Sequence, residues 1–420
     1  MLALVDAPIE QPPVATGKLV RAWFILLPLL YYANSGSPGT TETTTAENLS
    51  RTHQIGLLIV SVICSTLILK RFTVVFAASL RMKLILALPV LALLSAGWSV
   101  DPRQSIVSAI TFLCFTLFAI YLTETFTTNG QLDLIMLAGA IAVPASIALA
   151  LFVPSIGATP AGWRGIFTHK QQCAAAVTLF LVTAIHWKPT RPLHRPLRVI
   201  YVFMCLGLIV MSQSRTGWLL TLFALALSGS LRFLQKMAAK DSLFVLVTAL
   251  PIVGGIVYLV SLLANVILSS VGKEPTLSER TIIWAAAWDA IIQRPLLGYG
   301  YEAFWRGLQG ASKDVVLIAG WNLYQAQSGY LDLWLQLGVC GVISLALMTL
   351  QAGTNAIRSF RHKSDSSFVR WCIVVIACSL IYNIGESDFG YLRILWLLFV
   401  IACIGLKKEA QTMTGSSSTK

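Results

Sequence analysis

Arg294-Pro-Leu-Leu-Gly-Tyr-Gly-Tyr-Glu302 and Gln325-Ala-Gln-Ser-Gly-Tyr-Leu-Asp332 stand near the end of a polar interval that runs from Gly272 to Tyr330. This interval is the longest run of the chain that lipid could not bury. The sequence on either side of it is strongly apolar. A long loop among short connections is more often functional than filler, so we expect a functional site here.

The composition of the chain excludes a soluble globule. Of its 420 residues, 56% are hydrophobic and only 12% are charged, and the mean hydropathy is +0.75. These values predict an all-α polytopic membrane protein. The net charge of +13 comes from basic residues in the short links between apolar segments. That distribution follows the positive-inside rule and does not indicate a nucleic-acid partner.

The apolar segments predict about twelve transmembrane helices in a single integral membrane domain spanning residues 1–420, because a crossing helix needs roughly twenty apolar residues. The predicted spans are 19–35, 54–70, 83–99, 104–124, 131–153, 171–187, 198–213, 216–234, 242–266, 329–351, 367–384 and 391–406. Between them, residues 71–82 contain an apolar piece too short to cross, for which we predict an interfacial position.

Lysine and arginine clusters alternate from link to link and set the predicted orientation. With twelve spans, every cluster falls on one side, which the positive-inside rule makes the cytoplasm. Both termini are then predicted to lie in the cytoplasm. The long loop, residues 272–327, is predicted to lie on the opposite side of the membrane and to contain an amphipathic helix.

That amphipathic helix is predicted from Glu279 to Gln293. Ser278 suits its N-cap, and the turn Gly298-Tyr-Gly300, after Pro295, is expected to follow its end. Its apolar stripe consists of Ile283, Ala287 and Ile291, and its indoles are Trp284 and Trp288. Such a helix is typical of a membrane surface, where the tryptophans would serve as aromatic anchors.

Two arginines on the predicted outer face are candidates for phosphate binding. Arg215 lies between two apolar spans among Ser212, Ser214 and Thr216, and Arg280 precedes Trp284 by one turn. Arginine can grip phosphate oxygens with a planar, permanently charged fork. The alternative is that both side chains only extend to lipid headgroups.

A second basic group occurs where an outer loop re-enters the membrane. Arg164, His169 and Lys170 lie on a face that is usually poor in positive charge. They indicate either a surface for an anionic lipid carrier or ordinary headgroup contacts. Walker motifs, paired-histidine metal sites and nucleophile-elbow serines are not found in the sequence.

Together these stretches resemble the family of O-antigen ligases and Wzy-type polysaccharide polymerases, and most closely its exopolysaccharide polymerase branch. The matching stretches are Ser95-Ala-Gly-Trp-Ser-Val-Asp-Pro102, Gly165-Ile-Phe-Thr-His-Lys170, Ser212-Gln-Ser-Arg-Thr-Gly217, Arg280 with Trp284, Pro295-Leu-Leu-Gly-Tyr-Gly300, and Gly329-Tyr-Leu with Leu337-Gly338.

The resemblance implies a metal-independent, inverting glycosyltransferase without a cofactor. It would polymerise undecaprenyl-diphosphate-linked oligosaccharide repeat units into exopolysaccharide or O-polysaccharide at the periplasmic face of the bacterial inner membrane, which makes the long loop periplasmic. Arg215 and Arg280 would bind the diphosphate and stabilise its charge as the glycosidic bond breaks. The implied partners are the lipid-linked oligosaccharide, the growing glycan acceptor, membrane lipids, a chain-length regulator and export proteins. The residues expected to contact substrate are Arg164, His169, Lys170, Trp284, Glu302 and Tyr330.

Gln327 departs from the family pattern, in which many members have a histidine just before the Gly-Tyr-Leu stretch. Glutamine cannot accept a proton usefully, although it can position a hydroxyl or an arginine. Either His169, Glu302 or Asp314 is the base, or the reaction needs none. Two other functions stay open: a ligase that passes the finished glycan to lipid A core or to a protein, and a lipid or sugar transporter.

Overall fold

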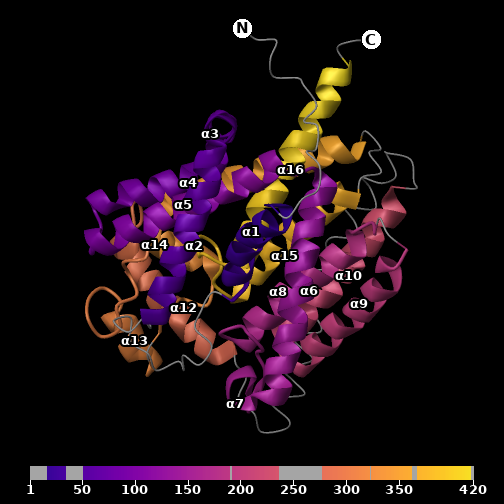
Figure 1. Cartoon of the computed structure of the whole chain (residues 1–420). Helices are drawn as coiled ribbons and strands as arrows, with labels where there is room; N and C mark the ends of the chain where they lie inside the picture. The colour runs from indigo at the N-terminus through magenta and orange to yellow at the C-terminus, as the bar shows by residue number, and fades with distance from the viewer. Residues whose placement is uncertain are drawn as a thin grey trace.

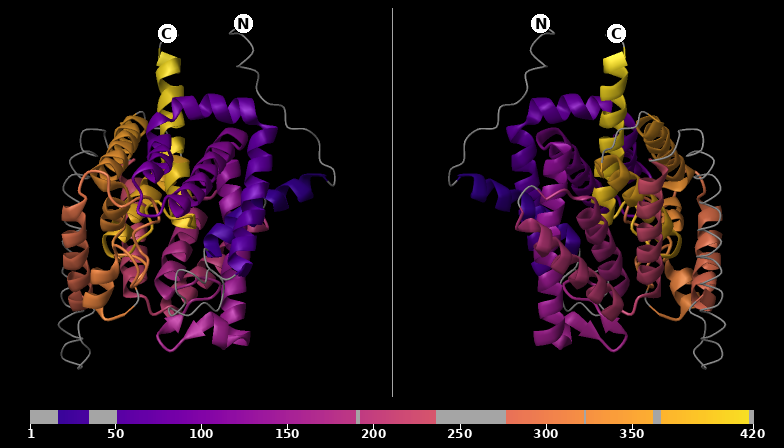
Figure 2. Two further views of the ribbon diagram at one scale, coloured as in Figure 1. Left: turned by 90° about the vertical axis from the view of Figure 1, so that its left-hand side faces the viewer. Right: turned by 90° about the vertical axis from the view of Figure 1, so that its right-hand side faces the viewer.

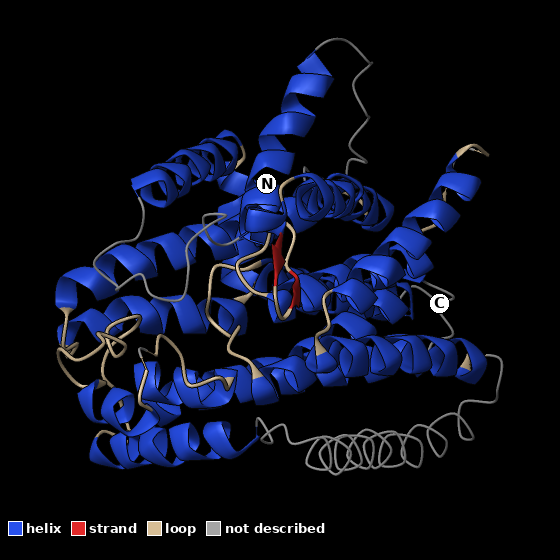
Figure 3. Ribbon diagram, turned by 90° about the horizontal axis from the view of Figure 1, so that it is seen from below, coloured by secondary structure: helices blue, strands red, loops and turns tan. Residues whose placement is uncertain are grey.

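The structure, a computed structural model, describes residues 17–34, 51–189, 192–235, 277–321, 323–361 and 367–417. Apart from one short hairpin, its regular elements are helices (Figure 3). The hairpin pairs β1 (Ala158–Thr159) with β2 (Gly162–Trp163) in antiparallel fashion. The prediction of an all-helical chain is therefore confirmed for the described ranges.

The helices follow one another in the order labelled in Figure 1. The first group comprises α1 (Gly17–Asn34), α2 (Arg51–Lys70), α3 (Phe72–Arg81), α4 (Lys83–Leu94), the 3-10 turn η2 (Ser95–Gly97), α5 (Pro102–Thr125), α6 (Thr128–Phe152) and α7 (Pro154–Gly157). The second comprises α8 (Lys170–His186), α9 (His194–Met211), α10 (Arg215–Leu234), α12 (Leu277–Gln293), α13 (Lys313–Ala319), α14 (Gly329–Arg361), α15 (Ser367–Gly385) and α16 (Ile394–Ser417).

Helices occupy every predicted span except 242–266, which lies outside the described residues. Six of the described helices are long and apolar enough to cross a membrane, or up to seven with the bent pair α2 and α3. Others are shorter than the roughly twenty residues that a crossing needs: α8 has 17 and α4 has 12. The chain is a polytopic helical bundle, and the count of twelve spans stays a prediction.

The short segment at 71–82 forms helix α3, which does not continue α2. The two helices meet at a bend of 91°. As a result α3 lies across one end of the bundle (Figure 2). A helix of 10 residues cannot cross 30 Å of hydrocarbon. The interfacial position predicted for it is consistent with this geometry.

The centre of the bundle is formed by helices that are apolar on all sides, as buried helices are. In α8 every residue from Gln172 to Ala184 is buried. α15 packs against α8, α10 and α16, and α16 also packs against α5 and α14. The indole of Trp371 in α15 donates a hydrogen bond of 2.9 Å to the hydroxyl of Thr183 in α8. This contact joins the start of α15 to the end of α8, so the two helices run in opposite directions.

The two ends of the bundle differ in chemistry. At one end, Lys407 of α16 donates a hydrogen bond to the carbonyl of Arg81, and Lys408 pairs with Glu124 at 3.3 Å. The start of α15 and the end of α8 lie there too. This end therefore collects the basic links that we predict to be cytoplasmic. At the other end lie the starts of α8, α10 and α14 and the end of α15.

Candidate active site

Arg280 is held by two side chains from distant parts of the chain. Its Nε donates to Oε1 of Gln327 at 3.0 Å, and its Nη2 donates to Oε1 of Glu386 at 2.8 Å. Arg280 lies in the first turn of α12, Gln327 precedes α14, and Glu386 follows α15. The guanidinium is fixed in orientation while its side chain keeps 21% exposure. We call Arg280, Gln327 and Glu386 the arginine clamp.

Helix α12 is positioned by its apolar stripe. Ile283, Ala287 and Ile291 are buried, as the sequence predicted. They pack on protein, against Val316 of α13 and Leu335 of α14. A position of this helix at a membrane surface stays a prediction. The predicted cap was wrong: the helix begins at Leu277, which puts Ser278 in the first turn.

Trp284 fixes the backbone beside Gln327. Its indole Nε1 donates to the carbonyl of Ala326 at 3.1 Å. Gln327 itself has a φ of +52°, a left-handed conformation that costs a non-glycine residue about 1–2 kcal/mol. The strained backbone and the Trp284 contact set the direction in which the Gln327 amide reaches Arg280. Trp284 therefore supports the backbone beside Gln327, and its role as a membrane anchor stays a prediction.

Glu386 is a site residue that the sequence reasoning missed. It is 8% exposed, and burial raises the pKa of its carboxyl above the usual 4.5, an effect that Arg280 opposes. Gly385 leaves room for the arginine, since a Cβ there would lie 2.8 Å from Nη1 of Arg280. The available signal was an acidic residue in a short polar link between two apolar spans.

Asp332 braces both sides of the arginine clamp. This fully buried carboxylate accepts hydrogen bonds of 3.0 Å from the amide of Ala326, next to Gln327. It also accepts from the hydroxyl of Ser387, next to Glu386, and from the indole of Trp305 at 2.7 Å. One buried carboxylate thus positions two of the three clamp residues.

Glu302 and Tyr330, predicted to contact substrate, make contacts inside the protein. Burial and the nearby Asp332 carboxylate raise the pKa of Glu302 to about 7, which Arg393 opposes. The backbone amide of Glu302 donates to Oε1 of Gln336 at 3.2 Å. The Tyr330 hydroxyl donates to the carbonyl of Leu380 at 2.9 Å. Their described contacts are structural, and a substrate contact for either residue stays a prediction.

Arg215 lies at the same end of the bundle as the clamp, on a different element. Helix α10 begins at this residue, and the hydroxyl of Ser214 accepts a bond of 3.1 Å from the amide of Gly217. Arg215 is exposed, and Lys170 lies close enough for the two charges to repel. The helix end is therefore polar and cationic, as predicted. The hydrogen bonds described for Arg280 go to the clamp residues and do not include this group.

The remaining basic candidates brace the re-entering loop. Arg164 donates from Nε to the carbonyl of Ile156 at 2.8 Å, and Lys170 donates from Nζ to the carbonyl of Ala161 at 2.8 Å. His169 is the residue immediately before α8. Among the candidate bases, Asp314 is exposed on α13. These contacts give Arg164 and Lys170 a structural role, and a carrier-binding role stays a prediction.

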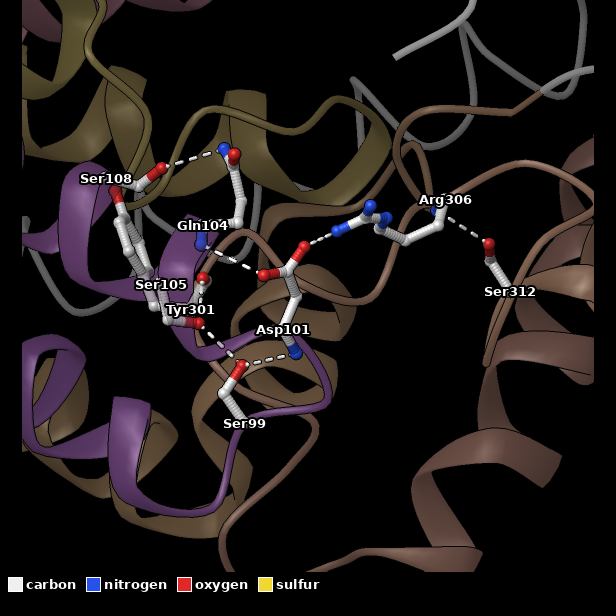
Figure 4. Close-up of polar contacts among 8 residues, drawn as sticks. All are labelled: Ser99, Asp101, Gln104, Ser105, Ser108, Tyr301, Arg306 and Ser312. Carbon is white, nitrogen blue, oxygen red and sulfur yellow. Dashed lines mark hydrogen bonds and ion pairs between the residues drawn. The ribbon is translucent and has the colours of Figure 1, made fainter. Parts of the chain in front are cut away.

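Two of the stretches that carried the family resemblance dock on each other. Residues 95–102 meet residues 295–302, far apart in the sequence (Figure 4). Ser95 Oγ accepts from the amide of Tyr301 at 3.0 Å, and Ser105 Oγ donates to the carbonyl of Tyr301 at 2.8 Å. Asp101 forms an ion pair with Arg306. These stretches attach the long loop to the helical bundle. Their described contacts indicate no catalytic role.

The glycine turn after α12 inserts at a break in α14. Gly298 and Gly300 have positive φ values of +67° and +101°, which confirms the predicted turn. The amide of Tyr299 donates to the carbonyl of Leu335 at 2.8 Å. Gly338 breaks the helix with a φ of +63°, and a Cβ there would lie 2.1 Å from the carbonyl oxygen of Leu296. The two turns fit only because both positions lack side chains.

Potential metal ligands stay dispersed in the described part of the chain. No group of three or more His, Cys, Asp or Glu side chains that could hold a metal ion comes together among the described residues. The expectation of a metal-independent reaction stays a prediction.

The fold and the site define a class: a multi-pass helical membrane protein whose arginine clamp lies at one polar end. Comparison with known proteins shows which family part of the chain is similar to. Residues 200–346 match the O-antigen ligase family, so the resemblance predicted from the sequence is confirmed. This range contains Arg215, Arg280 and Gln327, whereas Glu386 lies beyond it.

One curated relative matches part of the chain. The chain is 26% identical over 152 residues to the exopolysaccharide production protein ExoQ of Rhizobium meliloti (strain 1021). The match covers 34% of this chain and 34% of that relative.

Proposed function

We propose that the protein is a polysaccharide polymerase that joins lipid-linked oligosaccharide repeat units. The observation that carries the proposal is the arginine clamp, a partly exposed guanidinium fixed within the range that matches the O-antigen ligase family. The similarity to an exopolysaccharide production protein supports polymerisation as the reaction. The donor is an undecaprenyl-diphosphate-linked glycan, and the acceptor is the growing chain.

Arg280 binds the diphosphate of the donor. A guanidinium has five N–H donors, and the clamp contacts use Nε and one N–H of Nη2. The remaining donors can form a bidentate contact with phosphate oxygens. Because Gln327 and Glu386 hold the group in place beforehand, little orientational freedom is lost when the diphosphate binds. Arg215, a second cation at this end, attracts the same anion.

Glu386 balances the charge of Arg280 until the donor arrives. Its raised pKa means that the protein already disfavours the charged carboxylate. A diphosphate brought beside Arg280 adds negative charge and raises that pKa further. Proton uptake by Glu386 then frees the guanidinium to interact with the phosphate oxygens. Glu386 is in this account a positioning residue that acts through Arg280.

The transfer step needs charge stabilisation at the leaving group. The acceptor hydroxyl attacks the anomeric carbon, the bond from that carbon to the diphosphate oxygen breaks, and the acceptor proton leaves to solvent. Attack from the opposite face inverts the anomeric carbon. Arg280 and Arg215 stabilise the negative charge that develops on the diphosphate. A diphosphate is a good leaving group, so the reaction runs without a strong base, in keeping with glutamine at position 327.

The two alternative functions, a ligase and a lipid or sugar transporter such as a flippase, predict different products in a deletion strain. Loss of a polymerase leaves single repeat units, loss of a ligase leaves long unattached chains, and loss of a flippase strands units in the cytoplasmic leaflet. The test is to delete the gene and analyse the lipid-linked glycans by mass spectrometry. Single repeat units restored to polymer by the wild-type gene would support the proposal. Long unattached chains would assign the ligase function instead.

A further inference from the structure

Helix α3 lies at the end of the bundle opposite to the arginine clamp. It meets α2 at a bend of 91° and runs across that end of the bundle (Figure 2). One side of α3 packs on the protein: Val75, Ala78 and Ser79 are buried, and α5 is a neighbour of the helix. The helix is therefore fixed to the bundle, separate from the proposed active site, and its other side faces outward.

The outward side of α3 is apolar. Phe72, Phe76 and Leu80 recur every four residues, so they form one stripe along the helix. Each of these side chains is more than half exposed, and the two phenyl rings stack with their centroids 5.6 Å apart. Large apolar groups are unfavourable in water, whereas the acyl boundary of a bilayer accommodates them. The stripe therefore fits the surface layer of a membrane.

Four cations flank this stripe at the two ends of α3. Lys70 and Arg71 precede the helix, Arg81 is its last residue, and Lys83 begins α4. Lys70, Arg81 and Lys83 are exposed. The ion pairs among the described residues include none of these four side chains. Their charges are therefore open to a partner outside the described part of the chain.

The segment that carries these cations contains no acidic residue. No aspartate or glutamate occurs from residue 48 to residue 100. At the same end of the bundle, Lys407 of α16 donates to the carbonyl of Arg81 and adds a further cation, while Glu124 is paired with Lys408 at 3.3 Å. The surface around α3 is therefore cationic, and it complements a layer of negative charge.

We propose that α3 and its four flanking cations form a binding surface for anionic phospholipids of the surrounding bilayer. The apolar stripe enters the acyl boundary, and the cations contact the phosphate oxygens of the headgroups. Interfacial helices that combine apolar aromatic side chains with basic residues bind anionic bilayers in this way, and each cation near the bilayer surface strengthens the attraction. The inference is independent of the proposed function, since it involves no residue of the arginine clamp.

The test titrates phosphatidylglycerol or phosphatidylcholine onto the purified full-length protein and measures bound lipid by native mass spectrometry. Arg81→Gln/Lys83→Gln removes two exposed cations from the surface around α3. Arg81→Lys/Lys83→Arg keeps both charges. The matched control is Lys188→Gln/Arg195→Gln, which also removes two exposed cations from this end of the bundle, but on the side formed by α8 and α9.

Arg81→Gln/Lys83→Gln is expected to bind phosphatidylglycerol about 25-fold more weakly than the wild type, from about fivefold for each cation removed. The charge-keeping variant and the control should bind it as the wild type does, and phosphatidylcholine should bind weakly to all four proteins. Equal loss in the control would overturn the proposal, because the attraction would then come from the whole basic end. Loss in the charge-keeping variant would also overturn it, as would equal affinities of the wild type for the two lipids.

The apolar stripe is tested separately with Phe72→Ser/Phe76→Ser. Because these substitutions leave every cation in place, both lipids should bind more weakly, and phosphatidylglycerol should keep its advantage over phosphatidylcholine. Unchanged binding of both lipids would overturn the insertion of the stripe. Sodium phosphate added at the lipid concentration should not displace phosphatidylglycerol from the wild type. Displacement would assign the cations to free phosphate and overturn the lipid surface.

Discussion

Arg280 and Glu386, separated by 106 positions in the sequence, form an ion pair of 2.8 Å at the polar end of the bundle. The pair is largely removed from water, with side-chain exposures of 21% and 10%. Breaking such a pair by removing one partner leaves an uncompensated charge, which is strongly unfavourable. We therefore expect activity to be sensitive to substitution of either partner.

Arg280→Lys and Arg215→Lys keep the positive charge but lose the planar fork. Each is expected to lower polymer formation by roughly 30- to 1000-fold, since one charge-assisted phosphate contact contributes about 2–4 kcal/mol to the barrier. The measurement is an in vitro assay with lipid-linked repeat units, with membrane levels of each variant checked by immunoblot. Arg358→Lys, at the opposite end, is the control. Near-normal polymer formation by both lysine variants would indicate that these arginines only contact lipid headgroups.

Glu386→Gln and Glu386→Ala separate positioning from proton transfer. Glutamine still accepts a hydrogen bond from Arg280, whereas alanine leaves Nη2 without this partner. If Glu386 positions Arg280, the alanine variant loses roughly tenfold more activity than the glutamine variant. This ratio corresponds to the free energy of about one charge-assisted hydrogen bond. Rates measured across the pH range provide the check. Equal losses in the two variants, with a carboxylate-like pH inflection present only in the wild type, would make Glu386 the base.

Gln327→Ala is expected to cost roughly tenfold in rate, less than loss of either arginine fork, because a neutral hydrogen bond contributes about 0.5–1.5 kcal/mol. Gln327→His should bring no gain if the reaction needs no base at this position. Both variants are assayed from about pH 5.5 to about pH 8.5, which brackets a histidine titration. A higher rate for the histidine variant, with an inflection near about pH 6.5, would show that the enzyme lacks a base.

Gly338→Ala should severely reduce the amount of folded protein. The new Cβ would lie 2.1 Å from the carbonyl oxygen of Leu296, in a backbone conformation with φ of +63°. Gly353→Ala in the same helix is the matched control, since a Cβ at that position would meet nothing within 4 Å. This control should melt at or slightly above the wild-type temperature. The measurement is thermal unfolding in detergent. Equal melting temperatures for the two variants would refute the close approach of Gly338 to the carbonyl of Leu296.

The orientation of the chain is tested with reporters active only in the periplasm. A fusion after Lys313 should be active, and a fusion after Arg195 should be silent, because the basic links are predicted to stay in the cytoplasm. The reverse pattern would place the arginine clamp on the wrong side for periplasmic polymerisation.

The sequence alone determined the helical membrane class, the positions of the described helices, the turn at Gly298 and Gly300, and the buried stripe of α12. These follow from local rules: hydropathy over about twenty residues, a helical period of 3.6, and the freedom of glycine to take positive φ. The family resemblance rested on short stretches whose order was visible without knowing what each stretch contacts. Arg280 and Gln327 were also chosen from the sequence.

Only the tertiary structure decided how those stretches combine. It paired residues 95–102 with 295–302, packed the apolar stripe of α12 against α13 and α14, and brought Glu386 to Arg280. It also placed Asp332 where it braces both sides of the clamp. These contacts join residues far apart in the chain, and no local periodicity or spacing encodes them. The packing of α14, α15 and α16 sets these distances, since it determines where the polar ends of the helices meet.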